Sequence, residues 1–196
     1  MNPLVDRIGE PPILKFRARA ETLKPLPGRV YDMSQAVPSF PTFPGIVAEV
    51  ARALRDPKIS VYTADEGLPE LRKAVAVWHP LSASLDQSNV LITAGANHAM
   101  YTALTLHFRI GDKVLLLEPY YFNHEMALRM LGLKPESFVL RADNGFRLEA
   151  RLVIARLKSS GARGIVLVSP NNPTGACYDT LELLKLLDWA KKARVQ

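Results

Sequence analysis

Short apolar runs that alternate with helical patterns constrain the fold of this chain more than any other feature of its sequence. In chain order the runs cover residues 90–95 (VLITAG), 113–119 (KVLLLEP), 136–140 (ESFVL) and 164–168 (GIVLV), of which the third is the weakest. Continuous apolar runs of this length are typical of strands buried on both faces, and strands that alternate with helices form parallel sheets. The sequence therefore predicts an α/β fold with three αβα layers and a mostly parallel sheet.

The helical patterns that follow these runs cover residues 96–108, 124–131, 148–157 and 179–193. The last begins at Asp179, and Glu182 stands three residues later, which is the spacing of a capping box. Two earlier helical patterns are expected, one at residues 44–54 and one that ends at Trp78. Prolines crowd the first 40 residues, so this segment is expected to be an extended arm.

Composition narrows the classes of function. The net charge is +6, but the basic residues are scattered and form no stripe with aromatic residues, so we expect no nucleic-acid partner. Cys177 is the single cysteine, which excludes an internal disulfide, and the histidines do not have metal-ligand spacing with carboxylates. No apolar run approaches the roughly 18 residues that span a bilayer. We therefore expect no metal, no membrane partner and a cytoplasmic location.

Ligands of parallel α/β sheets bind outside the carboxyl ends of the strands, so the loops there are candidates for a site. In the first loop, Gly95 takes a strand directly into a helix. The free N–H groups of Ala96 and Asn97 then point out of the helix N-terminus, where a phosphate can bind. The alternative is an ordinary strand-to-helix turn with an asparagine cap.

Two further loops follow the next strands. EPYYFNHE, residues 118–125, contains three aromatic residues, of which one can stack on a flat ring while the others fill the core. In SPNNPTGACY, residues 169–178, Pro173 biases Asn172 toward an extended backbone, and its amide can donate to an oxygen of a bound ring. The alternative for this loop is a turn closed by an Asx hydrogen bond.

Four motifs occur in a fixed order: Y-T-x-x-x-G-x-x-x-L-R at 62–72, T-A-G-A-N at 93–97, E-P-Y-Y at 118–121 and N-N-P-T-G at 171–175. This set resembles the class I/II aminotransferases, which are pyridoxal-phosphate (PLP) enzymes of fold type I. The resemblance covers nearly the whole chain from about residue 31. It implies the large domain of that fold, truncated before its last strands.

The resemblance also implies roles for individual residues. Tyr121 matches the aromatic residue that stacks on the PLP ring, and Asn172 matches the asparagine that binds its phenolic oxygen. The backbone at Gly95, Ala96 and Asn97 matches the phosphate site. Tyr62 matches a tyrosine that reaches the phosphate of a neighbouring subunit, which implies a homodimer with shared active sites. Residues 34–38 resemble the loop that contacts the substrate carboxylate, through Ala36 and Val37; many members of the family have glycine where Ala36 stands.

The family's domains would divide the chain into residues 1–42, an arm with part of the small domain, and residues 43–196, the first half of the large domain. Its Schiff-base lysine follows a serine by three positions, and no lysine here has a Ser or Thr three residues earlier. The resemblance thus implies that this lysine and the aspartate paired with the pyridine nitrogen lie beyond Gln196. The sheet would then lack the strands that separate the 90–94 strand from the 164–168 strand.

Three functions remain open at this point. The first is an aminotransferase that moves an amino group between an amino acid and a 2-oxo acid, represented here by its N-terminal half and inactive alone. The second is a non-catalytic fragment that binds PLP weakly or pairs with a full-length subunit. The third is a PLP-dependent lyase or synthase of the same family.

Overall fold

The computed structural model describes residues 3–4, 6, 8–23, 31, 36–78 and 84–196 of the chain. The chain divides into two compact units, one of residues 1–19 and 100–196 and the other of residues 20–99. We call them unit 1 and unit 2, and each is described by itself.

Unit 1 contains a parallel sheet of three strands in the order β2-β1-β3. The strands are β1 (Lys113–Glu118), β2 (Lys134–Val139) and β3 (Gly164–Val166). In the register, Leu116 of β1 lies opposite Ser137 of β2 and Val166 of β3. The central strand comes from the KVLLLE run, and its four middle residues are buried. The predicted parallel sheet is therefore confirmed, with a shorter β3 than the GIVLV run suggests.

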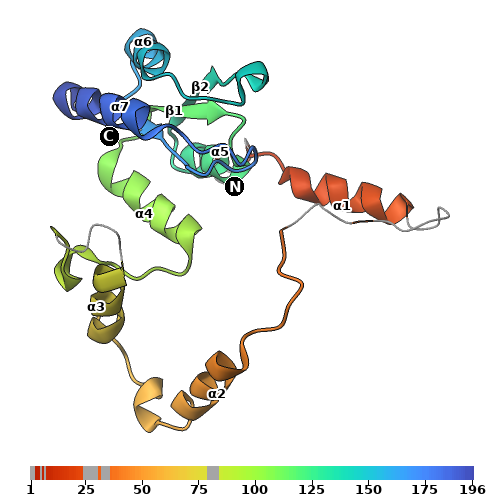
Figure 1. Ribbon diagram of the computed structural model, residues 1–196, viewed down its shortest axis with the longest axis vertical. Coiled ribbons are helices and arrows are strands. Elements are labelled where there is room, and N and C mark those ends of the chain that lie inside the picture. The colour runs from red at the N-terminus through yellow and green to blue at the C-terminus, as the bar shows by residue number, and fades with distance from the viewer. Residues whose placement is uncertain (1–2, 5, 7, 24–30, 32–35, 79–83) are drawn as a thin grey trace. The chain divides into compact units, whose positions relative to one another are not determined.

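Helices cover both faces of β1 (Figure 1). Leu115 and Leu117 lie in one core cluster with side chains of α6 (Ala150–Ser160) and α7 (Thr180–Ala193). Val114 and Leu116, on the opposite face, pack against α4 (Ala96–His107) and α5 (Phe122–Met130). Because successive side chains of a strand point to opposite faces, one apolar run supplies both cores. The predicted three-layer αβα architecture is confirmed.

The capping box at the start of α7 forms only in part. The Asp179 carboxylate accepts hydrogen bonds from the N–H groups of Leu181 and Glu182, as an N-cap should. The Glu182 carboxylate does not return to Asp179; it accepts from the Ala150 N–H at 2.7 Å and from Lys185. Ala150 is the first residue of α6, whose own N-cap residue Glu149 makes no side-chain cap bond. Glu182 thus caps the neighbouring helix, because α6 and α7 lie side by side.

The expected strand at residues 90–94 is absent from the described structure, so this prediction is wrong. The Ile92 N–H donates to Glu66 O at 3.0 Å, and Arg72 Nε donates to Val90 O at 2.9 Å. A strand exists only when a neighbour pairs with its backbone, and the described residues provide none here. The apolar run is therefore held by isolated bonds, one to the turn before α3 (Pro69–Trp78) and one from Arg72 of that helix.

The prediction of an extended arm is also wrong in part, since α1 (Pro12–Leu23) forms a helix there. Pro12 is its first residue, a position that tolerates proline, and residues 13–23 contain neither proline nor glycine. The helices α2 (Pro44–Ala53) and α3 (Pro69–Trp78) lie where the sequence predicts them. Short 3-10 helices cover Pro57–Ser60, Gln87–Asn89 and Ala142–Asn144.

Candidate functional site

In unit 1 the candidate site lies at the carboxyl ends of β1 and β3. These strands are neighbours, so the loops after them, residues 119–121 and 169–178, begin at the same edge of the sheet. The two loops are also joined directly, because Asn171 Nδ2 donates to Pro119 O at 3.0 Å. The X-Pro bonds before Pro119, Pro170 and Pro173 are cis, and all three lie in these loops. The structure therefore brings together two of the three loops that the sequence singles out.

Tyr121 is half-buried and is held by its neighbours in sequence. Asn123 Nδ2 donates to Tyr121 Oη at 2.8 Å. The ring centroid lies 4.8 Å from that of Phe122 and 5.6 Å from that of His124, which meets it edge-on at 89°. Burial lowers the pKa of His124, which favours the neutral imidazole. Tyr121 thus has a defined ring orientation before any ligand binds.

Tyr120 belongs to the core instead. It packs against the cluster that contains Leu128, and its hydroxyl donates to Glu125 Oε2 at 2.8 Å. Glu125 also accepts from Arg129 at 2.6 Å. Burial, followed by the hydrogen bond to Glu125, raises the pKa of Tyr120 to about 12. Tyr120 is thus one aromatic residue of this loop that fills the core, as expected, and the ring contact of Tyr121 stays a prediction.

The raised pKa of Tyr120 predicts a loss of stability at alkaline pH. Below pH ~10 the phenol is protonated in both states, and above it the unfolded state loses its proton first, so the stabilisation disappears as pH rises through the folded value of about 12. The full shift corresponds to ~2.7 kcal/mol, and because solvent reaches the phenol we expect ~1 kcal/mol.

Urea unfolding at about pH 9 and about pH 11.5 measures this loss. In Tyr120→Phe the difference between the two pH values should shrink by that amount. Tyr101→Phe, at an exposed position of α4, is the control and should behave like the parent chain. An equal loss in the parent chain and in Tyr120→Phe would contradict the prediction.

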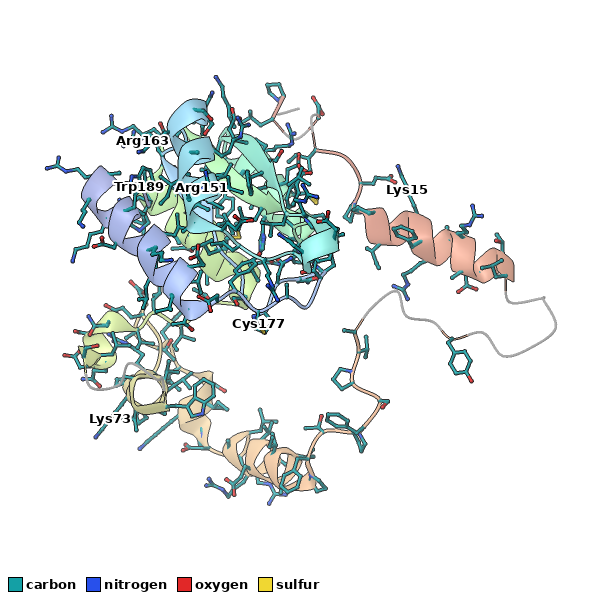
Figure 2. All side chains as sticks on the ribbon, turned by 45° about the horizontal axis from the view of Figure 1, so that its top comes forward. Lys15, Lys73, Arg151, Arg163, Cys177 and Trp189 are labelled. Atoms are coloured by element: carbon teal, nitrogen blue, oxygen red, sulfur yellow. The ribbon has the colours of Figure 1, made fainter. Side chains whose placement is uncertain are left out.

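The loop after β3 is closed on itself. The Asn171 N–H donates to Ala176 O at 2.8 Å, and the Gly175 N–H donates to Asn171 O at 2.7 Å, with Gly175 in the left-handed region at φ 72°. Asn171 is buried, whereas the adjacent Asn172 is exposed. The side chain of Asn172 is therefore free to meet a ligand. Cys177, in the same loop, is also exposed (Figure 2).

Sequence reasoning assigned no role to Asn171, although it is the buried member of the Asn-Asn pair. Both asparagines lie in the turn beyond the end of β3, so the alternation of strand side chains does not predict which of them points inward. Which one does so depends on tertiary contacts, which a local pattern does not contain.

The third loop belongs to unit 2. Gly95 has φ +85°, and α4 begins at the next residue, Ala96. Gly95, Ala96 and Asn97 are exposed, and the Ala99 N–H donates to Gly95 O at 3.2 Å. The N–H groups of Ala96 and Asn97 lie in the first turn, before intrahelical acceptors are available. This local geometry suits an anionic group, and the phosphate role of the three residues stays a prediction.

The remaining predicted residues are exposed. Tyr62 is fully exposed, at 104%, and Val37 is exposed at 74%, next to exposed Ala36. Ser34 and Gln35, of the predicted carboxylate-binding loop, lie outside the described residues. Within the described ranges, no three His, Cys, Asp or Glu residues gather as metal ligands would. No helix of the described part combines the length and the apolar character needed to cross a membrane.

Comparisons with known proteins give the family of the chain. The family model "Aminotransferase class I and II" matches residues 29–195. An aspartate aminotransferase of Streptomyces avermitilis is 31% identical over 95% of this chain and 46% of its own length. One from Sulfolobus acidocaldarius is 33% identical over 79% of this chain and 39% of its own length.

The fold comparison gives the same result. The crystal structure of the aspartate aminotransferase from Rhizobium meliloti superposes with a TM-score of 0.86 at 27% identity, covering 98% of this chain and 48% of that one. The chain thus spans about half the length of the relatives it matches. The family model alone covers most of the chain, so this chain belongs to the class I and II aminotransferases, which use pyridoxal phosphate.

Proposed function

We propose that this chain carries the cofactor-binding part of a PLP-dependent aminotransferase that moves an amino group between an amino acid and a 2-oxo acid. The observation that carries the proposal is the pair of joined loops in unit 1, which present Tyr121 and Asn172 at the carboxyl ends of adjacent strands. Ligands of parallel sheets bind at such positions.

The residues present fit the chemistry of PLP. The oriented ring of Tyr121 offers a face for the flat pyridine ring. The exposed amide of Asn172 has N–H groups to donate to its phenolic oxygen. The first-turn N–H groups of Ala96 and Asn97 are suited to its phosphate, and the open space around Gly95 lets such a group approach the backbone. PLP, when bound, supplies an electrophilic aldehyde and an electron-withdrawing ring.

The substrates and the assembly are part of the proposal. The relatives named above are aspartate aminotransferases, which makes aspartate the first amino donor to test. Ala36 and Val37 are exposed and available to a substrate carboxylate. Tyr62 is free to reach a neighbouring subunit, in keeping with a homodimer.

The 196-residue chain itself should bind PLP without a covalent link, since none of its lysines has the expected Ser or Thr three positions earlier. Borohydride treatment of the PLP-loaded chain, followed by peptide mass mapping, measures this. We expect no reduced adduct concentrated on one lysine. An adduct at a defined lysine would show that the chain has its own covalent anchor.

Loss of the Tyr121 ring should weaken PLP binding. Stacked aromatic pairs contribute about 0.5–1.5 kcal/mol beyond the area they bury, so Tyr121→Ala should raise the PLP dissociation constant roughly tenfold. Titration of PLP, followed by its visible absorbance, measures the constant. Phe16→Ala, at an exposed position of α1, is a matched aromatic truncation and should leave it unchanged. Equal affinities of Tyr121→Ala and the parent chain would sink the proposed ring site.

A further inference from the structure

Asn171 is one of two buried polar residues among those that the structure describes, with 6% of its surface exposed. Its side chain donates to Pro119 O at 3.0 Å and to Thr174 Oγ1 at 2.9 Å. Two acceptors use both hydrogens of its amide nitrogen. Such a side chain is fixed in rotamer and in the direction of both bonds.

The two acceptors lie on different loops. Thr174 belongs to the same turn as Asn171, and its hydroxyl oxygen also accepts from the Ala176 N–H at 3.2 Å. Pro119 is 52 residues away in sequence and directly follows β1. Pro119 also stands two residues before Tyr121, while Asn171 stands next to Asn172. A single carboxamide therefore links the backbones that carry the two predicted ring contacts.

The backbone ladder does not make this link. The pairing of β1 with β3 ends at Leu116 and Val166. Beyond these residues the segments after β1 and β3 lead into their loops, and no further strand pairing joins the two segments. After the ladder ends, the two segments are next joined by the hydrogen bond that the Asn171 side chain donates to Pro119 O.

We propose that Asn171 is a positioning residue that fixes Tyr121 relative to Asn172, so that both contact one cofactor ring. The inference rests on the proposed function, in which that ring is PLP. Asn171 acts through its neighbours and is too buried to touch the ligand itself. The requirement is for a donor toward Pro119 O, a carbonyl oxygen that can only accept: an oxygen in place of the amide nitrogen would leave both unpaired in a buried site.

Asn171→Asp tests this requirement, since it keeps the shape of the side chain and removes the donors. Asn144→Asp is the matched control, because it adds the same charge at a half-buried position outside the site, where Asn144 Oδ1 already accepts from the Arg147 N–H. Thr174→Val removes one acceptor at nearly constant shape, and Thr174→Ser keeps that acceptor. PLP is the probe, and its affinity and the position of its visible band are measured together with the backbone amide resonances of Tyr121 and Asn172.

We expect Asn171→Asp to shift the amide resonances of both Tyr121 and Asn172, to weaken PLP binding roughly tenfold or more and to move the visible band, since the contact to the phenolic oxygen is disturbed. Asn144→Asp should change none of these. Thr174→Val should reproduce part of the effect, and Thr174→Ser should restore the parent values. A parent-like affinity and an unshifted Tyr121 resonance in Asn171→Asp would overturn the inference.

Two other outcomes also decide it. If the parent chain shows no saturable PLP binding, the proposed function fails, and the resonances of the unliganded chain decide the inference alone. A shift at Tyr121 then supports it, and a change confined to residues 171–176 overturns it. If Asn171→Asp lacks the circular dichroism signal of a folded chain, the two Thr174 variants decide the inference. The Tyr121 resonance should then move in Thr174→Val and stay in place in Thr174→Ser.

Discussion

Leu186→Ala should lower the free energy of unfolding of unit 1 by about 2–5 kcal/mol. Leu186 is completely buried and lies on α7, in the cluster that also contains Leu115 of β1 and Leu157 of α6. Truncation at such a site loses the transfer free energy of the side chain and leaves a cavity that the close-packed neighbours fill only in part. The free energy of unfolding of a domain is roughly 5–15 kcal/mol in total, so this single change should remove a large share of the stability.

Urea unfolding followed by the fluorescence of Trp189 measures the effect, because Trp189 lies on the same helix (Figure 2) and packs against the same cluster. Leu184→Ala is the matched control: it lies on the same helix with 56% of its surface exposed, and should cost no more than about 0.5 kcal/mol. Equal losses for the two variants would mean that α7 does not pack on the sheet through Leu186.

The core of unit 1 is the part of the fold that its sequence predicts best. The KVLLLE run is apolar at four successive positions, and a short strand covered on both sides buries all of them. The helices beside it repeat their apolar residues at helical spacing, so their bounds agree with the sequence within a few residues. These features depend on residues close in the chain, which is why local patterns predict them.

Features that depend on distant partners were predicted less well. The run at 90–94 has the composition of a strand, but strand formation needs a paired neighbour. Glu182 has capping-box spacing, yet its carboxylate accepts a hydrogen bond from the N–H of Ala150, 32 residues away. The same division holds in the site. The loops with Tyr121 and Asn172 were identified from proline, glycine and aromatic residues, whereas the importance of Asn171 follows from Pro119, which only the folded chain brings close.

Gly67→Ala should be the most damaging small substitution in unit 2. Gly67 has φ +100°, a conformation that costs an L-residue about 1–3 kcal/mol. An added Cβ would also lie 2.6 Å from Ile92 Cγ1 and 2.7 Å from Ile92 Cβ. The Ile92 Cβ cannot rotate away, because it is bonded to a backbone whose N–H donates to Glu66 O, so the two segments must separate. Overpacking adds about 1–3 kcal/mol, which makes the expected total about 2–6 kcal/mol.

Hydrogen exchange at the Ile92 amide measures this loss, since that N–H is bonded to the residue before Gly67. Exchange should accelerate at least tenfold in Gly67→Ala, while the amide of buried Leu116 in unit 1 keeps its rate. Gly95→Ala separates strain from steric overlap: Gly95 has φ +85°, but nothing lies within 4 Å of its added Cβ. This control should carry the backbone cost alone and leave the Ile92 amide protected. If both variants exposed that amide equally, close contact with Ile92 would not be the reason for the glycine, and the left-handed backbone would be sufficient.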